Sequence, residues 1–205
     1  MPCMEKIVVI GSAGAGKSTF ARQLGAILDI DVLHLDCYFW EPGWREKSPS
    51  ERKEIQHTLM KKDRWIIEGT YLSTSEERLG AADWIIFLDI NVLICFWRII
   101  KRRIQNHNKY RLDLPVGCTE KLHWTYILKV LVFPLRGRRH LFQKRKQLMK
   151  VKNVNFTRLS SPKRVELFLQ KEAVNQQSTI NVFTEPGEVQ DYTDQRPSIL
   201  ELAHV

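Results

Sequence analysis

A glycine-rich segment at residues 11–18, Gly-Ser-Ala-Gly-Ala-Gly-Lys-Ser, constrains the fold of this chain more than any other part of the sequence. It directly follows the apolar run Lys-Ile-Val-Val-Ile at residues 6–10, which is typical of a strand buried on both faces. It leads into residues 17–28, where apolar side chains recur at helical spacing. A strand, this loop and a helix in that order satisfy the pattern GxxxxGK[ST] in its expected context.

The residue types of this loop are suited to binding phosphate. Glycines let successive backbone N–H groups turn toward one anion, and the helix that follows adds its positive N-terminal end. In such loops the lysine, here Lys17, reaches the β- and γ-phosphates, and the serine hydroxyl, here Ser18, is a ligand of Mg²⁺. The sequence therefore predicts ATP and Mg²⁺ as cofactors. The residues expected to contact ATP are Gly11, Ser12, Ala13, Gly14, Ala15, Gly16, Lys17, Ser18 and Thr19.

Strand and helix patterns alternate along the rest of the chain, which predicts an α/β fold with a doubly wound sheet and right-handed crossovers. The further expected strands are residues 31–35, 64–68, 84–88 and 154–159. The further expected helices are residues 48–62, 92–106, 119–133 and 161–171. Residues 172–205 are acidic and polar with little periodicity, and they are expected to form a loosely ordered tail.

The size and the cysteines favour a single domain in a reducing compartment. The chain has 205 residues, enough for one α/β domain with a full core. Its four cysteines form no CxxC pair, so we expect reduced thiols in a cytoplasmic protein. The longest apolar stretch, residues 84–100, is interrupted by Asp89, Asn91 and Arg98, so it divides into a strand and a helix and no membrane span is expected.

The charge of the chain is concentrated in its middle. Residues 91–171 contain 20 lysines and arginines against three acids, a net charge of +17. Residues 1–90 carry a net charge of −3 and residues 172–205 a net charge of −5. Such a basic middle indicates an anionic partner, which could be nucleotide phosphate, an acidic substrate or nucleic acid bound through residues 98–152. A solvated basic surface is the alternative for any single arginine.

Five segments together resemble the adenylate-kinase-like small P-loop kinases, and among them the bacterial adenylate-kinase-related proteins known as DNA topology modulation proteins. The segments are IGSAGAGKSTFARQL, LHLDCYFWEPGW, WIIEGTY, ADWIIFLDI and FWRIIKRR. The resemblance covers residues 5–171. It implies a three-layer P-loop NTPase fold, in which helices cover both faces of a five-stranded parallel sheet. It also implies a substrate-binding segment at about residues 37–63 and a mobile, helical basic lid at about residues 98–150.

The same resemblance gives roles to two carboxylates. Asp36, expected at the end of the second strand, would orient the substrate hydroxyl or hold a Mg²⁺-bound water. Glu68 falls where these kinases usually carry aspartate, and its longer side chain favours contact with the metal through water. The alternative for both is capping of a neighbouring helix or turn. For Asp89, after the fourth strand, helix capping is the favoured interpretation.

Arginines and aromatic residues complete the expected site. By resemblance, an arginine of the lid neutralises the transferred phosphate and a second one closes from the far side; we assign these roles to Arg102 and Arg138, beside Lys17 and Asp36. Arg98, Arg103, Arg111, Arg136 and Arg139 are further candidates. Tyr38, Trp40 and Trp44 either line the substrate pocket or form a small local core.

Three functions fit these patterns. The leading one is an ATP-dependent kinase whose phosphate acceptor is a small molecule, such as a nucleotide or nucleoside. The second is a nucleic-acid-associated ATPase, although the sequence carries no helix-turn-helix or zinc-finger motif. The third is a nucleotide-binding regulatory protein with little turnover, which the exchange of Asp for Glu at position 68 favours.

Overall fold

The computed structural model describes residues 4–105, 130, 132–133, 137–151 and 154–183. Its centre is a five-stranded sheet in the order β2-β5-β1-β6-β7, and every neighbouring pair in it is parallel. The strands are β1 (Lys6–Gly11), β2 (Val32–His34), β5 (Trp65–Glu68), β6 (Trp84–Leu88) and β7 (Asn155–Leu159). This confirms the α/β fold with a five-stranded parallel sheet that was predicted from the sequence.

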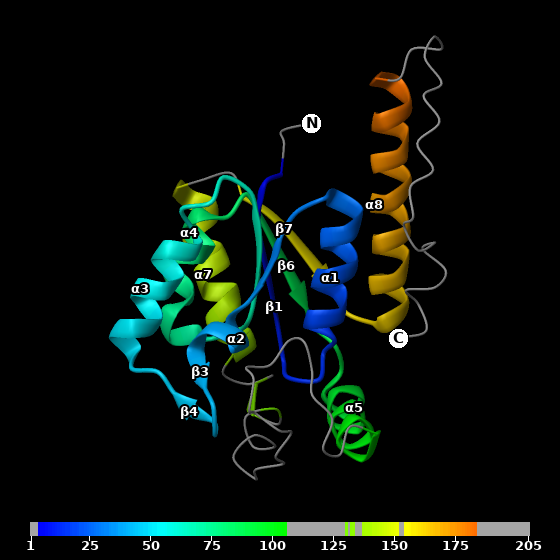
Figure 1. The fold of residues 1–205 in the computed structure, drawn as a ribbon. Coiled ribbons are helices and arrows are strands. Elements are labelled where there is room, and N and C mark those ends of the chain that lie inside the picture. The colour runs from blue at the N-terminus through cyan, green and yellow to red at the C-terminus, as the bar shows by residue number, and fades with distance from the viewer. Residues whose placement is uncertain (1–3, 106–129, 131, 134–136, 152–153, 184–205) are drawn as a thin grey trace.

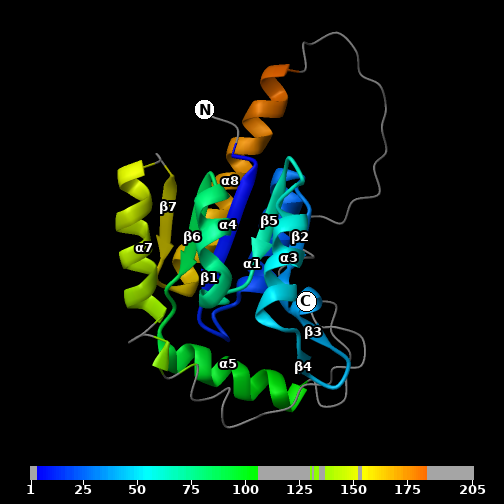
Figure 2. The same cartoon turned by 90° about the vertical axis from the view of Figure 1, so that its left-hand side faces the viewer.

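Helices cover both faces of this sheet (Figure 1). On one face lie α1 (Lys17–Leu28) and α8 (Pro162–Phe183). On the other lie α3 (Pro49–Leu59), α4 (Ser75–Ala81) and α7 (Gly137–Val151). Another helix, α5 (Val92–Gln105), runs across the carboxyl ends of the strands (Figure 2). In open parallel sheets these ends are where ligands bind.

Short elements follow β2 and β5 at this same end of the sheet. After β2 come the helix α2 (Leu35–Phe39) and an antiparallel pair, β3 (Trp40–Glu41) with β4 (Arg45–Glu46). A 3-10 turn, η1 (Leu72–Thr74), precedes α4. The predicted start of α3 is confirmed: Ser48 and Glu51 form a capping box, with Pro49 at the first helical position.

The strands form the core because they are apolar on both faces. Ile7, Val8, Val9 and Ile10 of β1 are all fully buried. Alternate residues of the sheet face opposite layers, so the buried side chains form one cluster with α1 and α8 and another with α3, α4 and α7. The central strand therefore holds the glycine loop at its end in a fixed position.

Two expectations need correction, and a third is not tested. The last helix does not end at residue 171 but continues through Phe183, so residues 172–183 are helical, and only residues 184–205 of the expected tail lie outside the described residues. Residues 137–151 are not part of a lid: Leu141 of α7 is buried and Phe142 packs on Phe87 of β6 at 6.1 Å between ring centroids. Most of the helix expected at residues 119–133 lies outside the described residues.

The role expected for Asp89 is also corrected. Its carboxylate contacts Arg138 and Arg158, whereas the backbone N–H of Leu93 at the start of α5 is bonded by the Asn91 side chain, at 2.8 Å. Both side chains follow the same strand, and the sequence favoured Asp89 for the capping role. Among the described residues, no helix is both long enough and apolar enough to cross a bilayer.

Candidate active site

The glycine loop ends β1 in a conformation that leaves its polar groups open to an anion. Gly14 and Gly16 have φ angles of 77° and 91°, which side-chain-bearing residues rarely adopt. Gly16 is also the N-cap of α1, and no side chain caps the N–H groups at this helix end. The Ser12 hydroxyl is buried and finds no partner among the described residues. A phosphate would satisfy these donors.

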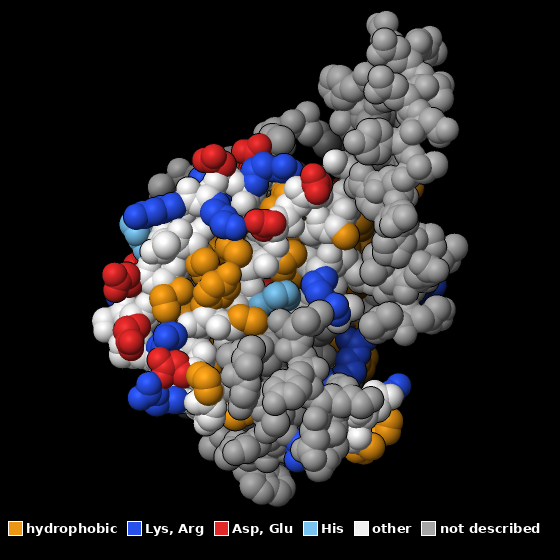
Figure 3. Space-filling view, viewed as in Figure 1, with side chains coloured by type: hydrophobic (Ala, Val, Ile, Leu, Met, Phe, Trp, Pro, Cys, Tyr) orange, Lys and Arg blue, Asp and Glu red, His pale blue; other side chains and the backbone are white. Residues whose placement is uncertain are grey.

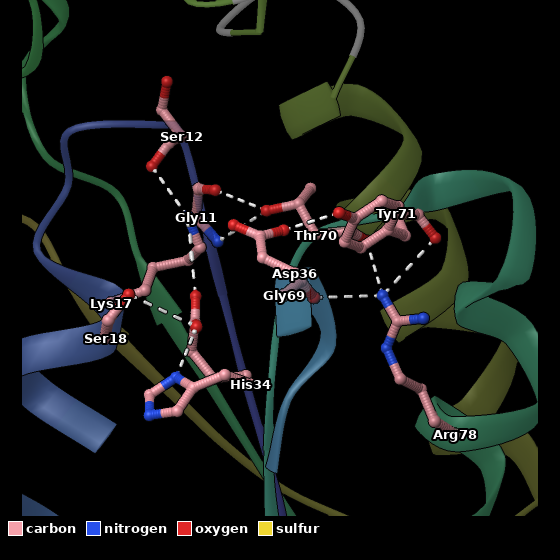
Figure 4. A network of polar contacts seen from close by, with 11 residues as sticks. Gly11, Ser12, Lys17, Ser18, His34, Asp36, Gly69, Thr70, Tyr71 and Arg78 are labelled. Carbon is pink, nitrogen blue, oxygen red and sulfur yellow. Dashed lines mark hydrogen bonds and ion pairs between the residues drawn. The ribbon is translucent and has the colours of Figure 1, made fainter. Parts of the chain in front are cut away.

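Lys17 and Ser18 face a carboxylate on the neighbouring strand (Figure 4). Lys17 Nζ donates to the carbonyl oxygen of Ser12 at 3.2 Å and lies 3.8 Å from Glu68 Oε1. Ser18 Oγ donates to Glu68 Oε2 at 3.3 Å. Glu68 is 4% exposed and also contacts His34 Nδ1 at 3.0 Å. The loop, β5 and β2 thus contribute one polar cluster at the end of the sheet.

The oxygens of Ser18 and Glu68 suit a magnesium ion held chiefly by phosphates and water. Mg²⁺ prefers hard oxygen ligands and usually takes only one or two from the protein in nucleotide sites. No group of three or more His, Cys, Asp or Glu side chains within the described part of the chain has the arrangement of a metal site. The residues present therefore fit Mg²⁺ bound together with nucleotide better than a metal held by protein ligands alone.

Asp36 lies in the first turn of α2, not at the end of a strand as the sequence suggested, because β2 already ends at His34. Its Oδ1 accepts a hydrogen bond from the Tyr71 hydroxyl at 2.5 Å. Figure 4 shows the Asp36 carboxylate pointing toward Tyr71 on the side of the sheet end where Gly11 and Thr70 meet. Asp36 therefore lies near Gly11 at this end of the sheet, and its role in the site stays a prediction.

The aromatic residues after Asp36 were expected either to line the substrate pocket or to form a small local core, and the structure places them differently from one another. Trp40 packs edge-to-face on Trp44, with 5.6 Å between ring centroids, and its Nε1 donates to the Tyr71 hydroxyl at 2.7 Å. Phe39 is fully buried, while Tyr38 is 37% exposed on α2. Trp40 is thus tied into the polar cluster. The part of Tyr38 and Trp44 in substrate binding stays a prediction.

Helix α5 lies directly against the glycine loop. A Cβ built on Gly14 would come within 2.3 Å of the carbonyl oxygen of Cys95, so only glycine fits there. Arg98 donates from Nη1 to the carbonyl oxygen of Ala15 at 3.3 Å. Cys95 itself is buried, and this burial raises the pKa of its thiol. The first turns of α5 therefore pack firmly on the phosphate-binding loop.

One of the arginines considered from the sequence, Arg98, contacts the glycine loop. Arg98, two turns from the start of α5, is the arginine of this helix for which a bond to the loop is described. The described contacts of Arg138 are an ion pair with Asp89 at 3.3 Å and packing over the Phe142 ring. Catalytic roles for Arg102 and Arg138 stay predictions, and Arg111 and Arg136 lie outside the described residues.

Four residues of the cluster escaped the sequence analysis as site residues: His34, Thr70, Tyr71 and Arg78. Thr70 binds the glycine-loop strand, because its Oγ1 donates to the Gly11 carbonyl oxygen at 2.5 Å. Arg78 is fully buried in α4 below the turn that carries Tyr71. Tyr71 and Thr70 belong to the segment WIIEGTY, which carried the resemblance, so a signal existed for them. For Arg78 no sequence pattern indicated burial.

Charge on the described surface is mixed. In Figure 3, acidic and basic side chains alternate over the helices on the left of the view, with hydrophobic side chains between them. Glu76 of α4 forms an ion pair with Lys144 of α7 at 2.5 Å. A nucleic-acid partner for residues 98–152 stays a prediction.

Comparison with known proteins places this site in a kinase-like fold. No family model matches the chain. It is 27% identical over 105 residues to an uncharacterized protein, YqaC, of Bacillus subtilis (strain 168). That match includes 50% of this chain and 59% of YqaC, so the chain spans little more than half the length of this curated relative.

Solved structures show the fold more fully. A shikimate kinase from Acinetobacter baumannii, in complex with shikimate, superposes with a TM-score of 0.55 at 15% identity, over 88% of this chain and 96% of that one. A gluconokinase from Sinorhizobium meliloti 1021 gives a TM-score of 0.46 at 12% identity, over 89% and 98% of the two chains. The superposition on the shikimate kinase thus supports the α/β fold of this chain.

Proposed function

We propose that this chain is an ATP-dependent kinase that transfers the γ-phosphoryl group to a hydroxyl of a small molecule. One observation carries the proposal: Lys17 and Ser18 of the glycine loop, Glu68 of the adjacent strand and Asp36 of α2 come together at one end of the sheet. The loop that would bind the phosphates and the Asp36 carboxylate, which could accept a proton, therefore lie at the same end of the sheet. The kinase fold of the neighbouring structures supports this assignment.

In the proposed reaction, the acceptor hydroxyl attacks the γ-phosphorus and its proton passes to the Asp36 carboxylate. The bond between the γ-phosphorus and the bridging oxygen breaks, and ADP leaves. Lys17 binds the β- and γ-phosphates of ATP, and the backbone N–H groups of the glycine loop bind the remaining phosphate oxygens. Arg98, next to Ala15, is placed to offset negative charge on these phosphates.

Mg²⁺ would supply charge neutralisation between the β- and γ-phosphates. Ser18 would bind it directly, and Glu68 through water. Because Glu68 already accepts a hydrogen bond from Ser18, this carboxylate orients the ligand oxygen as well. The acceptor is a small molecule; whether it is a nucleotide, a nucleoside or another hydroxylated metabolite is for experiment to decide. Membership among the DNA topology modulation proteins likewise stays a prediction.

The test is ADP formation with Mg²⁺ and ATP against a panel of nucleoside monophosphates, nucleosides and small hydroxylated metabolites. We expect one acceptor to stimulate turnover, and Lys17→Ala to reduce it at least about 100-fold, because the phosphates lose their charged partner. Lys53→Ala, at an exposed position of α3, is the control and keeps full activity.

Two results would count against a kinase. If no acceptor stimulates ADP formation but duplex DNA does, the chain is a nucleic-acid-dependent ATPase. If ATP binds tightly and is not turned over with any addition, it is a nucleotide-binding regulator.

A further inference from the structure

The turn that follows β5 has an unusual backbone. Gly69 has a φ of 146°, and a Cβ there would lie 2.9 Å from Cβ of Leu35. Two residues later, Tyr71 has φ 20° and ψ 70°, outside the regions that side-chain-bearing residues favour. For a residue with a side chain, such as Tyr71, this conformation costs on the order of 1–3 kcal/mol and persists where surrounding structure holds it. Something must therefore hold this turn in place.

Arg78 of α4 is what holds it. Its side chain is fully buried, and its guanidinium donates to five oxygens. They are the carbonyl oxygens of Gly69 (3.0 Å), Thr70 (2.5 Å) and Tyr71 (3.4 Å), Gln56 Oε1 (2.8 Å) and Thr74 Oγ1 (3.2 Å). Burial lowers the pKa of Arg78 to about 10, so the group is still charged at neutral pH. One buried cation thus binds three successive carbonyls of the strained turn.

The turn presents the Tyr71 hydroxyl to Asp36 in a fixed direction. The hydroxyl donates to Asp36 Oδ1 and accepts from Trp40 Nε1, while the ring packs edge-on against Phe39 at 4.7 Å between centroids. Burial raises the pKa of the Tyr71 phenol, and the negative charge of Asp36 raises it further. The phenol therefore stays protonated and remains a donor throughout the physiological pH range.

The same turn also contacts the glycine loop, where the phosphates would bind. Glu68, which precedes it, accepts from Ser18, and Thr70 within it bonds the main chain of Gly11. Glu68, Thr70 and Tyr71 thus tie the glycine loop and α2 to one segment. The separation between the phosphates and Asp36 is set by this segment, because the two sides share it.

We propose that Tyr71 is a positioning residue, which fixes the Asp36 carboxylate relative to the glycine loop through its hydroxyl. The inference rests on the proposed function, since it makes Tyr71 act on catalysis through Asp36. A five-residue helix such as α2 offers Asp36 little support of its own, and misplacement of a reacting group by about 1 Å costs on the order of 100-fold in rate.

Tyr71→Phe tests this with the ring retained and the hydroxyl removed. With the acceptor found in the panel, we expect kcat to fall about 10- to 100-fold while KM for ATP changes less than about twofold. In an Asp36→Asn background, Tyr71→Phe should cause no further loss, because its effect passes through Asp36. Losses that multiply in the double variant would overturn the proposal.

Thr157→Val is the matched control. It removes a similar partly buried hydrogen bond, donated by Trp84 Nε1 at 2.9 Å, between two strands away from Asp36. We expect it to lower the melting temperature and leave kcat unchanged. An equal fall of kcat in both variants would show that Tyr71 acts through general stability.

A measurement without turnover separates this proposal from the kinase assignment. The Asp36 carboxyl group is followed by ¹³C NMR in the full chain without nucleotide, over a range of pH. Loss of a hydrogen bond to the charged form should move its titration to higher pH in Tyr71→Phe. A shift in the absence of any kinase activity keeps the positioning role and discards the kinase. Identical titrations discard the positioning role even if the kinase is active.

Discussion

Glu68 illustrates how one side chain connects several parts of the site. Its carboxyl group is almost fully buried at the end of β5 and contacts Lys17, Ser18 and His34. A buried carboxylate is stable only when partners compensate for lost hydration. The Glu68 side chain is longer than that of aspartate, and it accepts a hydrogen bond from the Ser18 hydroxyl at the start of α1. We therefore regard it as the residue that prepares Ser18 for the metal.

Glu68→Gln should increase the Mg²⁺ concentration that nucleotide binding requires. The amide keeps the size of the side chain but loses the charge that orients Ser18 and attracts the metal. We expect the Mg²⁺ concentration for half-maximal binding of a fluorescent ATP analogue to rise about 10-fold, as for other groups that orient metal ligands.

Glu76→Gln, which breaks an exposed ion pair with Lys144, is the control and should leave this concentration unchanged. An unaltered Mg²⁺ requirement in Glu68→Gln would restrict Glu68 to a structural role.

At the scale of helices and strands, the packing of α5 against the glycine loop has the most direct consequence for the site. The loop bends where Gly14 lies under the carbonyl of Cys95, and Arg98 reaches Ala15 from the next turn of the same helix. The basic character of α5 was visible in the sequence, but its close packing on the loop was not. We infer that movement of α5 and the conformation of the loop are coupled.

Gly14→Ala tests this coupling. The new Cβ meets the Cys95 carbonyl oxygen and needs a positive φ, so we expect a loss of about 2 kcal/mol or more in the free energy of unfolding. Nucleotide affinity should fall at least about 10-fold, as measured by isothermal titration calorimetry.

Gly80→Ala is the matched control, since a Cβ at Gly80 in α4 contacts nothing within 4 Å. It should leave affinity unchanged and stabilise the chain by up to about 1 kcal/mol. If the nucleotide affinity of Gly14→Ala is unchanged, α5 moves away from the new side chain without changing the conformation of the loop, and the two are not coupled.

Sequence patterns predicted the strands better than the site. The strand at residues 84–88 was predicted residue for residue, because a continuous apolar run has clear ends. The glycine loop was recognised because the residues that define it, 11–18, are contiguous in the sequence. Asp36, by contrast, was expected at a strand end and lies in a helix. The Arg78 contacts depend on residues up to 22 positions away, and no local pattern reports such pairing.

For the whole molecule, nucleotide binding and folding are linked. The loop, β5, α2 and α5 come from different parts of the chain and meet only in the folded state, so an unfolded chain has no site. A ligand that binds only the folded state stabilises it by an amount that grows with concentration.

We therefore expect ATP with Mg²⁺ at 100 times its dissociation constant to add about 2.7 kcal/mol of stability. For a chain of this size, this corresponds to a rise of about 5–11 °C in the melting temperature, followed by differential scanning fluorimetry. Lys17→Ala at the same nucleotide concentration should show almost none of this rise. A full rise in that variant would place the nucleotide elsewhere.

The strand order also governs when the site comes into existence during synthesis. β1 is the central strand, and its partners on either side are β5, where Lys6 pairs with Trp65, and β6, where Ile7 pairs with Trp84. A ribosome releases the glycine loop long before these partners, so a growing chain carries the complete motif with nothing to hold it. The glycine-rich motif is made before its partner strands, and under the proposed function the ability to bind nucleotide is acquired only after residue 88 has emerged.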